Sequence, residues 1–222
     1  MWTIYRHAKG MLYIGLGAAL HSEDLTPYQQ YRCLYENELS KSWIRPLEMF
    51  QERVSEEQLR FTPVGRVRVV SPQDESRVLS FGYDTWGAGR PLQEFLAEYD
   101  SDRNHLVGTG YLFELMDGTT VSALNTLRFF RDRVGIARVA TDVAQRSRGY
   151  ATILMKATLE ILRLENADMR FLLFSEIDPI FYQQLGFVTL PMEWQHFSPS
   201  VAMISGDAPA LRSDQALVQK YF

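Results

Sequence analysis

The chain has 222 residues, is 46% hydrophobic and 23% charged, and carries a formal net charge of −4 at pH 7. This apolar content suffices for a buried core, so we predict one domain spanning residues 1–222. The small negative charge and the lack of a basic run exclude a nucleic-acid-binding protein. The one cysteine, Cys33, excludes an internal disulfide framework, and the four histidines lack metal-ligand spacing, so we expect no metal.

An apolar run at residues 11–20 follows Arg6 and Lys9, as the apolar region of a secretory signal does. The run is too short to span a membrane and is diluted by glycines. We therefore predict short strands at residues 2–5 and 12–14, with a turn between them. The protein is then expected in the cytoplasm, without membrane contact.

The next stretch predicts two helices. The first starts either at Ser22-Glu-Asp or at Thr26-Pro27, where Thr26 can cap and Pro27 suits the first helical position, and apolar side chains recur at helical spacing up to Leu39. We predict this helix over residues 26–39 and a second helix over residues 46–59.

The following segment has strand and loop signals. Residues 64–70 alternate like a strand that is exposed on one side, and residues 78–81 are predicted to pair with it. Residues 82–91 form a loop that carries a tryptophan, a tyrosine and an aspartate among three glycines. This loop either closes over a substrate or merely connects its neighbours, and residues 92–99 then form a short helix.

A series of strands follows. Asp117-Gly118 predicts a hairpin turn between strands at residues 106–115 and 119–130, because aspartate and glycine suit the positive φ angles of such a turn. A third strand is predicted at residues 134–141. Three antiparallel strands therefore lead into the loop that precedes the long helix.

The long helix predicted over residues 149–164 is amphipathic. Its apolar stripe must pack on the sheet, whereas Glu160 and Arg163 lie on the opposite, polar face. The short apolar run at residues 171–174 predicts a strand parallel to the one before the helix, and residues 200–204 predict a final strand.

The loop between strand and helix has the features of an anion site. Residues 146–151 read Arg-Ser-Arg-Gly-Tyr-Ala, so Gly149 permits close approach of a ligand and Arg146 and Arg148 add positive charge. The first N–H groups of a helix lack intrahelical partners and can hold a pyrophosphate. No nucleotide-binding glycine fingerprint occurs in the chain. A plain loop glycine with solvated arginines is the alternative interpretation.

Two motifs carry a family resemblance. Arg146-Ser-Arg-Gly-Tyr-Ala151 resembles the acyl-CoA signature Gln/Arg-x-x-Gly-x-Gly/Ala of the GCN5-related N-acetyltransferases (GNATs), and residues 171–190 resemble that family's later strand, helix and strand, with Tyr-x-x-Leu-Gly-Phe. The resemblance covers roughly residues 105–204. It implies an α/β fold with a mixed, central splayed β-sheet flanked by helices, in which antiparallel strands are followed by a parallel pair.

The resemblance also implies a division of the single domain. Residues 1–104 supply strands and helices on the acceptor side, residues 105–204 form the acyl-CoA-binding core, and residues 205–222 form a C-terminal tail. This tail leaves a homodimer interface open.

The same resemblance assigns the cofactor-binding residues. Backbone N–H groups on the third strand hold the pantetheine, and the loop and first helical turn hold the pyrophosphate. Ser175 stands where the family often has an asparagine, so its contact with the cofactor is open. The cofactor-binding residues are then Val139, Thr141, Arg146, Ser147, Arg148, Gly149, Tyr150, Ala151 and Ser175.

Tyr182 is the predicted catalytic residue. It stands at the tyrosine of the second motif, where a phenol can protonate the departing thiolate. Its alternative role is packing or hydrogen bonding to the cofactor. The general base stays open among Glu114, Asp142 and Glu176, and an ordinary cap or turn bond is the alternative role of Asp142.

These features together predict an N-acetyltransferase that moves an acetyl group from acetyl-CoA to a primary amine by direct attack. Its partners are acetyl-CoA and an amine-bearing small molecule or protein. Two alternatives stay open, namely a catalytically silent sensor that binds acyl-CoA and a protein-interaction module that does not bind coenzyme A.

Overall fold

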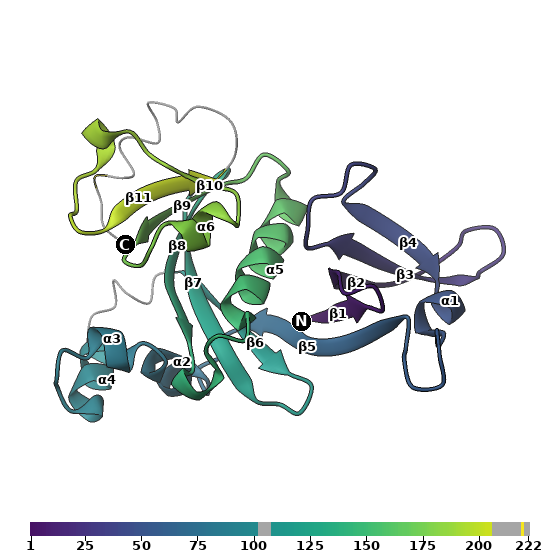
Figure 1. Cartoon of the computed structure of the whole chain (residues 1–222), viewed down its shortest axis with the longest axis horizontal. Coiled ribbons are helices and arrows are strands. Elements are labelled where there is room, and N and C mark those ends of the chain that lie inside the picture. Colours follow the sequence, from purple (N-terminus) through teal and green to yellow (C-terminus); the bar gives the residue numbers. More distant parts are fainter. Residues whose placement is uncertain (102–107, 206–218, 220–222) are drawn as a thin grey trace.

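The computed structural model describes residues 1–101, 108–205 and 219. The strands of the described chain are β1 (Trp2–His7), β2 (Leu12–Leu20), β3 (Pro27–Cys33), β4 (Ser42–Pro46), β5 (Phe61–Val69), β6 (Thr109–Leu115), β7 (Thr120–Phe130), β8 (Arg133–Thr141), β9 (Arg170–Ser175), β10 (Phe187–Thr189) and β11 (Val201–Ser205). They form one 11-stranded sheet in the order β10-β11-β9-β8-β7-β6-β5-β1-β2-β3-β4. The molecule has two lobes, and β5 runs from one into the other (Figure 1).

The N-terminal lobe is an antiparallel meander, β1 to β4, joined to β5. Strand β5 pairs with β1 from Phe61, opposite His7, to Val67, opposite Trp2. The short helix α1 (Leu47–Gln51) places Phe50 against Phe61, with ring centroids 4.1 Å apart. A mostly aromatic hydrophobic core fills this lobe, and its buried members are Tyr13, Tyr31, Phe50, Phe61 and the non-aromatic Cys33.

The helices predicted at residues 26–39 and 46–59 are wrong, apart from α1. The first region forms β3 and β4, and the apolar side chains that fit helical spacing also fit the two-residue period of a strand. Within β3, Gln29, Tyr31 and Cys33 alternate as buried residues, and Cys33 lies opposite Tyr13 of β2. Aromatic side chains favour strands where neighbouring strands offer such cross-strand contacts.

The second lobe contains the predicted mixed sheet. Strands β5 to β8 are antiparallel to their neighbours, whereas β8 and β9 are parallel. In the described structure, their pairing starts at Arg133 and Arg170 and ends at Gly135 and Leu172. Beyond those residues the two strands diverge and leave a splay, so the predicted fold class is confirmed.

Helices cover both faces of this sheet. Helix α5 (Tyr150–Glu165) packs on the face that carries Phe113, and α2 (Glu75–Ser80) packs on the face that carries Leu112. Neighbouring residues of a strand point to opposite faces, which explains this division. The other helices are α3 (Tyr83–Trp86), α4 (Leu92–Ser101) and α6 (Ile180–Gln183).

The strand predicted at residues 78–81 is also wrong, since this segment falls largely within α2. Strand β5, its expected partner, already pairs with β1 on one side and β6 on the other. Both sides of β5 are therefore already occupied by strands where residues 78–81 would have to pair. Val78 and Phe81 instead pack as helical side chains against Leu112 and Ala123.

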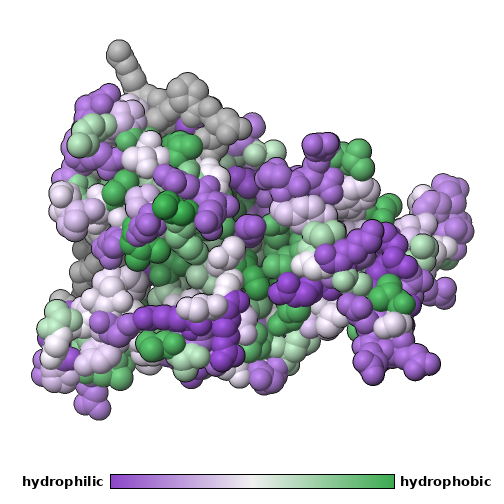
Figure 2. Space-filling model, viewed as in Figure 1, coloured by the Kyte–Doolittle hydropathy of each residue, from purple (hydrophilic) through white to green (hydrophobic). Residues whose placement is uncertain are grey.

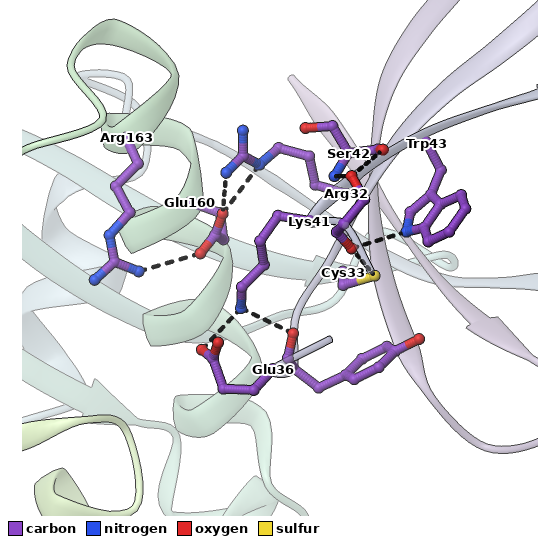
Figure 3. A network of polar contacts seen from close by, with 10 residues as sticks. Arg32, Cys33, Glu36, Lys41, Ser42, Trp43, Glu160 and Arg163 are labelled. Atoms are coloured by element: carbon purple, nitrogen blue, oxygen red, sulfur yellow. Dashed lines mark hydrogen bonds and ion pairs between the residues drawn. The ribbon is translucent and has the colours of Figure 1, made fainter. Parts of the chain in front are cut away.

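The N-terminal lobe contacts the face of α5 that was predicted to be polar. Glu160 on this face is only 5% exposed. Its carboxylate accepts from Arg32 Nε at 3.0 Å and Nη2 at 2.9 Å, and from Arg163 Nη1 at 3.1 Å (Figure 3). A charged side chain can be buried here because Arg32 of β3 brings the matching charge from a distant part of the chain.

Helices of the described chain are all too short or too polar to cross a membrane.

The strands predicted at residues 134–141, 171–174 and 200–204 are confirmed as β8, β9 and β11, with small shifts of their ends. The predicted tail at residues 205–222 lies outside the described residues, except for Ser205 and Gln219.

Candidate active site

The loop between β8 and α5 has an open helix start. Asp142 ends the strand, and its carboxylate accepts the Ala144 N–H at 3.0 Å, as a turn-forming aspartate does. Ser147 and Gly149 both have positive φ, 63° and 78°. Gly149 occupies the cap position of α5 and has no side-chain acceptor, so the first N–H groups of the helix point to the loop without a capping side chain.

The predicted pyrophosphate residues lie together in this loop. Arg146, Ser147, Arg148 and Gly149 are all exposed to solvent. Tyr150 instead turns inward and packs against Phe113, with ring centroids 5.8 Å apart. Exposed charge beside unpartnered helix N–H groups fits an anionic group such as a pyrophosphate.

Arg146 is held by two elements. Its Nε donates to the Thr141 carbonyl at 3.1 Å, and its Nη1 and Nη2 contact the two carboxylate oxygens of Asp84 at 2.6 and 2.7 Å. The hydrogen bonds between these side chains raise the pKa of Arg146 and lower the pKa of Asp84. Asp84 belongs to α3, so part of the segment predicted as a loop that either closes over a substrate or merely connects is a short helix in contact with the loop before α5.

Strand β8 carries a bulge at the predicted pantetheine site. Ala140 lies opposite Ala123 and Ala137 opposite Asn125, so two residues of β8, Arg138 and Val139, occupy the space of one on β7. Arg138 has a left-handed φ of 55°, which accommodates the extra residue. A bulge leaves backbone groups out of the ladder, here in the pairing of β8 with β7 at Arg138 and Val139.

Among the other predicted cofactor-binding residues, Thr141 and Ser175 have side-chain hydroxyls that are hydrogen-bonded within the protein. Thr141 Oγ1 lies 3.0 Å from Ser122 Oγ. Ser175 is 1% exposed, and its Oγ donates to the Ile177 carbonyl at 2.7 Å. Ala151 lies half-buried in the first turn of α5.

Tyr182 lies in α6, with its ring against Phe181 and Phe187 at centroid distances of 4.9 and 6.1 Å. Burial, together with the negative charge of Glu176, raises the pKa of Tyr182 to about 12. Its hydroxyl makes no hydrogen bond to another described residue. The phenol is therefore protonated at neutral pH and free to donate.

The three predicted base candidates all have partners. Glu114 contacts Arg68 at 3.2 Å, on a guanidinium that also binds Asp74. Asp142 forms the turn bond to Ala144 described above. Glu176 accepts a hydrogen bond from Trp86 Nε1 at 2.8 Å.

A cavity of about 150 Å³ lies between α2, α3 and the sheet face beside the bulge. Its walls include Val78 and Leu79 of α2, Trp86 of α3, and Arg138 and Ala140 of β8. The space-filling view shows hydrophobic residues in the depth between α2 and α6 (Figure 2).

Glu75, on the first turn of α2, also lines this cavity and was not among the predicted residues. Val78 and Leu79 follow Glu75 by three and four residues, which is the spacing of side chains on one face of a helix. This spacing is the sequence signal that could have grouped the three residues. That pattern was hidden because the segment was predicted as a strand.

The strand order β5-β6-β7-β8-β9-β11-β10, the splay and the open start of α5 are those of an α/β acetyltransferase. Residues 52–187 match the model of the acetyltransferase (GNAT) family. The chain therefore belongs to the GNAT family. The fold supports acyl transfer from a CoA-bound donor.

Residues 3–63, which form most of the N-terminal lobe, separately match a model described as a protein of unknown function (DUF1653).

Solved structures resemble about two thirds of this chain in fold. One from Lactobacillus plantarum, provisionally described as an N-acetyltransferase, is 16% identical, with 64% of this chain and 97% of that chain covered and a TM-score of 0.51. Escherichia coli ElaA is 20% identical, with 64% and 99% covered and a TM-score of 0.50. Tetrahymena GCN5 is 13% identical, with 66% and 98% covered and a TM-score of 0.50. No curated protein matches the chain.

Proposed function

We propose that this protein is a cytoplasmic N-acetyltransferase that moves the acetyl group of acetyl-CoA to a primary amine by direct attack. The observation that carries this proposal is the open start of α5, where unpartnered helix N–H groups lie beside exposed Arg146 and Arg148. A sensor that binds acyl-CoA without turnover would need the same loop. Turnover therefore has to be tested separately from binding.

The chain's residues divide the work as follows. The loop residues Arg146 to Ala151 hold the pyrophosphate, and the bulged segment around Val139 pairs with the pantetheine in the splay between β8 and β9. A backbone N–H at the bulge polarises the acetyl carbonyl. Tyr182, protonated at neutral pH, gives a proton to the sulfur as it leaves.

We assign the acceptor side to α2 and α3, within residues 1–104. These helices border the cavity beside the bulge, and the N-terminal lobe packs on the opposite side of α5. The helices predicted at residues 26–39 and 46–59 do not contribute to this side, because the region forms β3, β4 and the short α1 of the N-terminal lobe. A reducing cytoplasm suits the one cysteine, Cys33, which is buried and unpaired.

Calorimetric titration with acetyl-CoA tests the binding step. Gly149→Glu should abolish binding, because its carboxylate would repel the pyrophosphate and its φ of 78° disfavours a side chain. Gly118→Glu is the matched control: Gly118 also has a positive φ, 89°, with open space at its Cβ position, but lies in the hairpin turn before β7. Equal binding by wild type and Gly149→Glu would refute the assigned pyrophosphate site.

An amine screen with detection of released thiol tests turnover. An N-acetyltransferase should release coenzyme A in stoichiometric amounts with acetylated amine. Binding of acetyl-CoA without product for any amine would instead support the sensor.

A further inference from the structure

The cavity beside the β8 bulge is lined by apolar side chains, by Asn125 and Arg138, and by one carboxylate, that of Glu75. Val70, Val78, Leu79 and Leu124 supply hydrocarbon surface. Glu75 lines the same space, is half-buried, and forms no hydrogen bond or ion pair with any residue that the structure describes. A half-buried carboxylate without a partner at the wall of a cavity is suited to a cationic ligand.

Other carboxylates near this face are occupied. Asp74, the neighbour of Glu75 in sequence, binds Arg68 at 2.6 Å, and Glu114 binds the same guanidinium. Asp142 accepts a backbone N–H in its own turn, and Glu176 accepts from Trp86. Glu75 therefore differs from each of these carboxylates, because it lines the cavity and accepts no hydrogen bond from a described residue.

The cavity also adjoins the proposed reaction centre. Arg138 and Ala140, which flank Val139 in the bulged strand, form part of its wall. A group held in the cavity thus lies beside the strand segment along which the thioester is proposed to lie. Trp86 closes another side of the same space from α3.

The size of the cavity limits the ligand. Its volume is about 150 Å³, the volume of an engineered protein cavity that holds benzene, which has six non-hydrogen atoms. The apolar walls suit a hydrocarbon chain or ring of this size, and Glu75 suits an ammonium group attached to it.

We infer that this cavity is the acceptor pocket for a compact primary amine of about six non-hydrogen atoms, and that Glu75 is the general base of the reaction. This inference rests on the proposed acetyltransferase function. The ammonium gives one proton to the Glu75 carboxylate, and the neutral nitrogen attacks the acetyl carbonyl. The C–N bond forms and the C–S bond breaks.

Tyr182 carries the second proton from the amine nitrogen to the sulfur in two transfers. Its phenol protonates the departing thiolate to give the thiol of coenzyme A. The resulting phenolate takes the second proton from the acetylated nitrogen. Glu75 then releases its proton to water, and the enzyme returns to its starting state.

The test uses n-pentylamine, which has six non-hydrogen atoms, with the full-length protein saturated with acetyl-CoA. Wild type should acetylate it, and Glu75→Gln should lower kcat/KM by at least about 100-fold, the usual contribution of a general base. Glu75→Asp should recover part of the activity. Glu94→Gln, which removes an exposed carboxylate from α4, should match wild type.

Steady-state kinetics separate a base from a merely structural residue. Loss of a base lowers kcat, whereas loss of a residue that only holds the amine raises KM with kcat unchanged, so Glu75→Gln should show its main effect in kcat at saturating pentylamine. An unchanged kcat, or equal turnover of pentylamine by wild type and Glu75→Gln, would overturn the role of Glu75.

Calorimetry distinguishes failure of this inference from failure of the proposed function. If wild type binds acetyl-CoA but neither binds nor acetylates pentylamine, the acceptor pocket is wrong while the acyl-CoA site stands. If wild type does not bind acetyl-CoA, the proposed function itself fails.

Discussion

Asp84 and Arg146, which are 62 residues apart, form a two-pronged ion pair with contacts of 2.6 and 2.7 Å. The pair ties α3 to the loop at the start of α5. Its side chains are 42% and 40% exposed, so it adds little to stability. Its significance lies in position, because the guanidinium that is proposed to bind the pyrophosphate already binds a carboxylate.

Asp84→Asn should therefore strengthen acetyl-CoA binding. The carboxylate competes with the pyrophosphate for Arg146, and its removal should lower the dissociation constant by about three- to five-fold at low salt. Calorimetry measures this, with Asp168→Asn near the far end of α5 as the control for a general change of charge. Weaker binding by Asp84→Asn would show that Asp84 instead holds Arg146 in its binding position.

Tyr182→Phe should lower turnover by about 100-fold while acetyl-CoA affinity stays close to that of wild type. The hydroxyl bonds to no described residue, so the free energy of unfolding should change by less than about 1 kcal/mol. Since burial raises the pKa of Tyr182 to about 12, no limb of the wild-type pH profile below pH 10 should come from this phenol. Steady-state kinetics and urea unfolding measure both effects, and full activity of Tyr182→Phe would exclude Tyr182 as the acid.

Glu160→Gln should destabilise the protein by about 3 kcal/mol, because it leaves the partly buried charges of Arg32 and Arg163 without their carboxylate. Glu165→Gln is the matched control on the same helix. Its partner Arg128 is 42% exposed, and loss of that pair should cost less than about 1 kcal/mol. Urea unfolding of the two variants compares them, and equal stabilities would mean that the N-terminal lobe does not depend on this contact.

Asp74 makes stability depend on pH. The Arg68 guanidinium holds the pKa of this carboxyl well below its usual range. The Asp74–Arg68 pair therefore contributes fully to the free energy of unfolding above the unfolded-state pKa of aspartate, about 3.9. This contribution is lost as the pH falls below that value toward the folded-state pKa of Asp74. Asp74→Asn should lower the free energy of unfolding by about 2 kcal/mol at pH 7, and the difference should shrink between pH 4 and pH 2.

Urea unfolding of wild type and Asp74→Asn at pH 7, 4 and 2.5 tests this dependence. A constant difference between the two proteins across this range would contradict the assigned pair.

The regions that were predicted correctly depend on short-range sequence signals. The hairpin at Asp117-Gly118, strand β8, the loop that follows it and α5 succeed one another, and each has its own local pattern. The positive φ at Gly149 follows from the residue type and the start of the helix. These features need no information about distant partners.

The errors share one cause, which is contact between distant segments. The side chains of residues 27–33 fit a helix until β2 supplies a strand partner. Residues 78–81 fit a strand until β1 and β6 occupy both sides of β5. Such pairings depend on the whole fold.

Site contacts between distant segments were missed for the same reason. Asp84 reaches Arg146, Trp86 reaches Glu176, and Glu75 faces the cavity only because α2 and α3 pack beside β8. No local pattern around Asp84 distinguishes a partner of Arg146 from a solvated aspartate.

Strand β5 has hydrogen-bonded neighbours on both sides, and one of these neighbours belongs to the N-terminal lobe. A shortened chain that began after residue 46 would lack β1. The backbone N–H and C=O groups of β5 between Phe61 and Val67 would then face solvent as a template for strands of other molecules. The N-terminal lobe thus shields the acetyltransferase sheet from aggregation through this strand, and shortened versions should precipitate at concentrations where the whole chain stays dispersed.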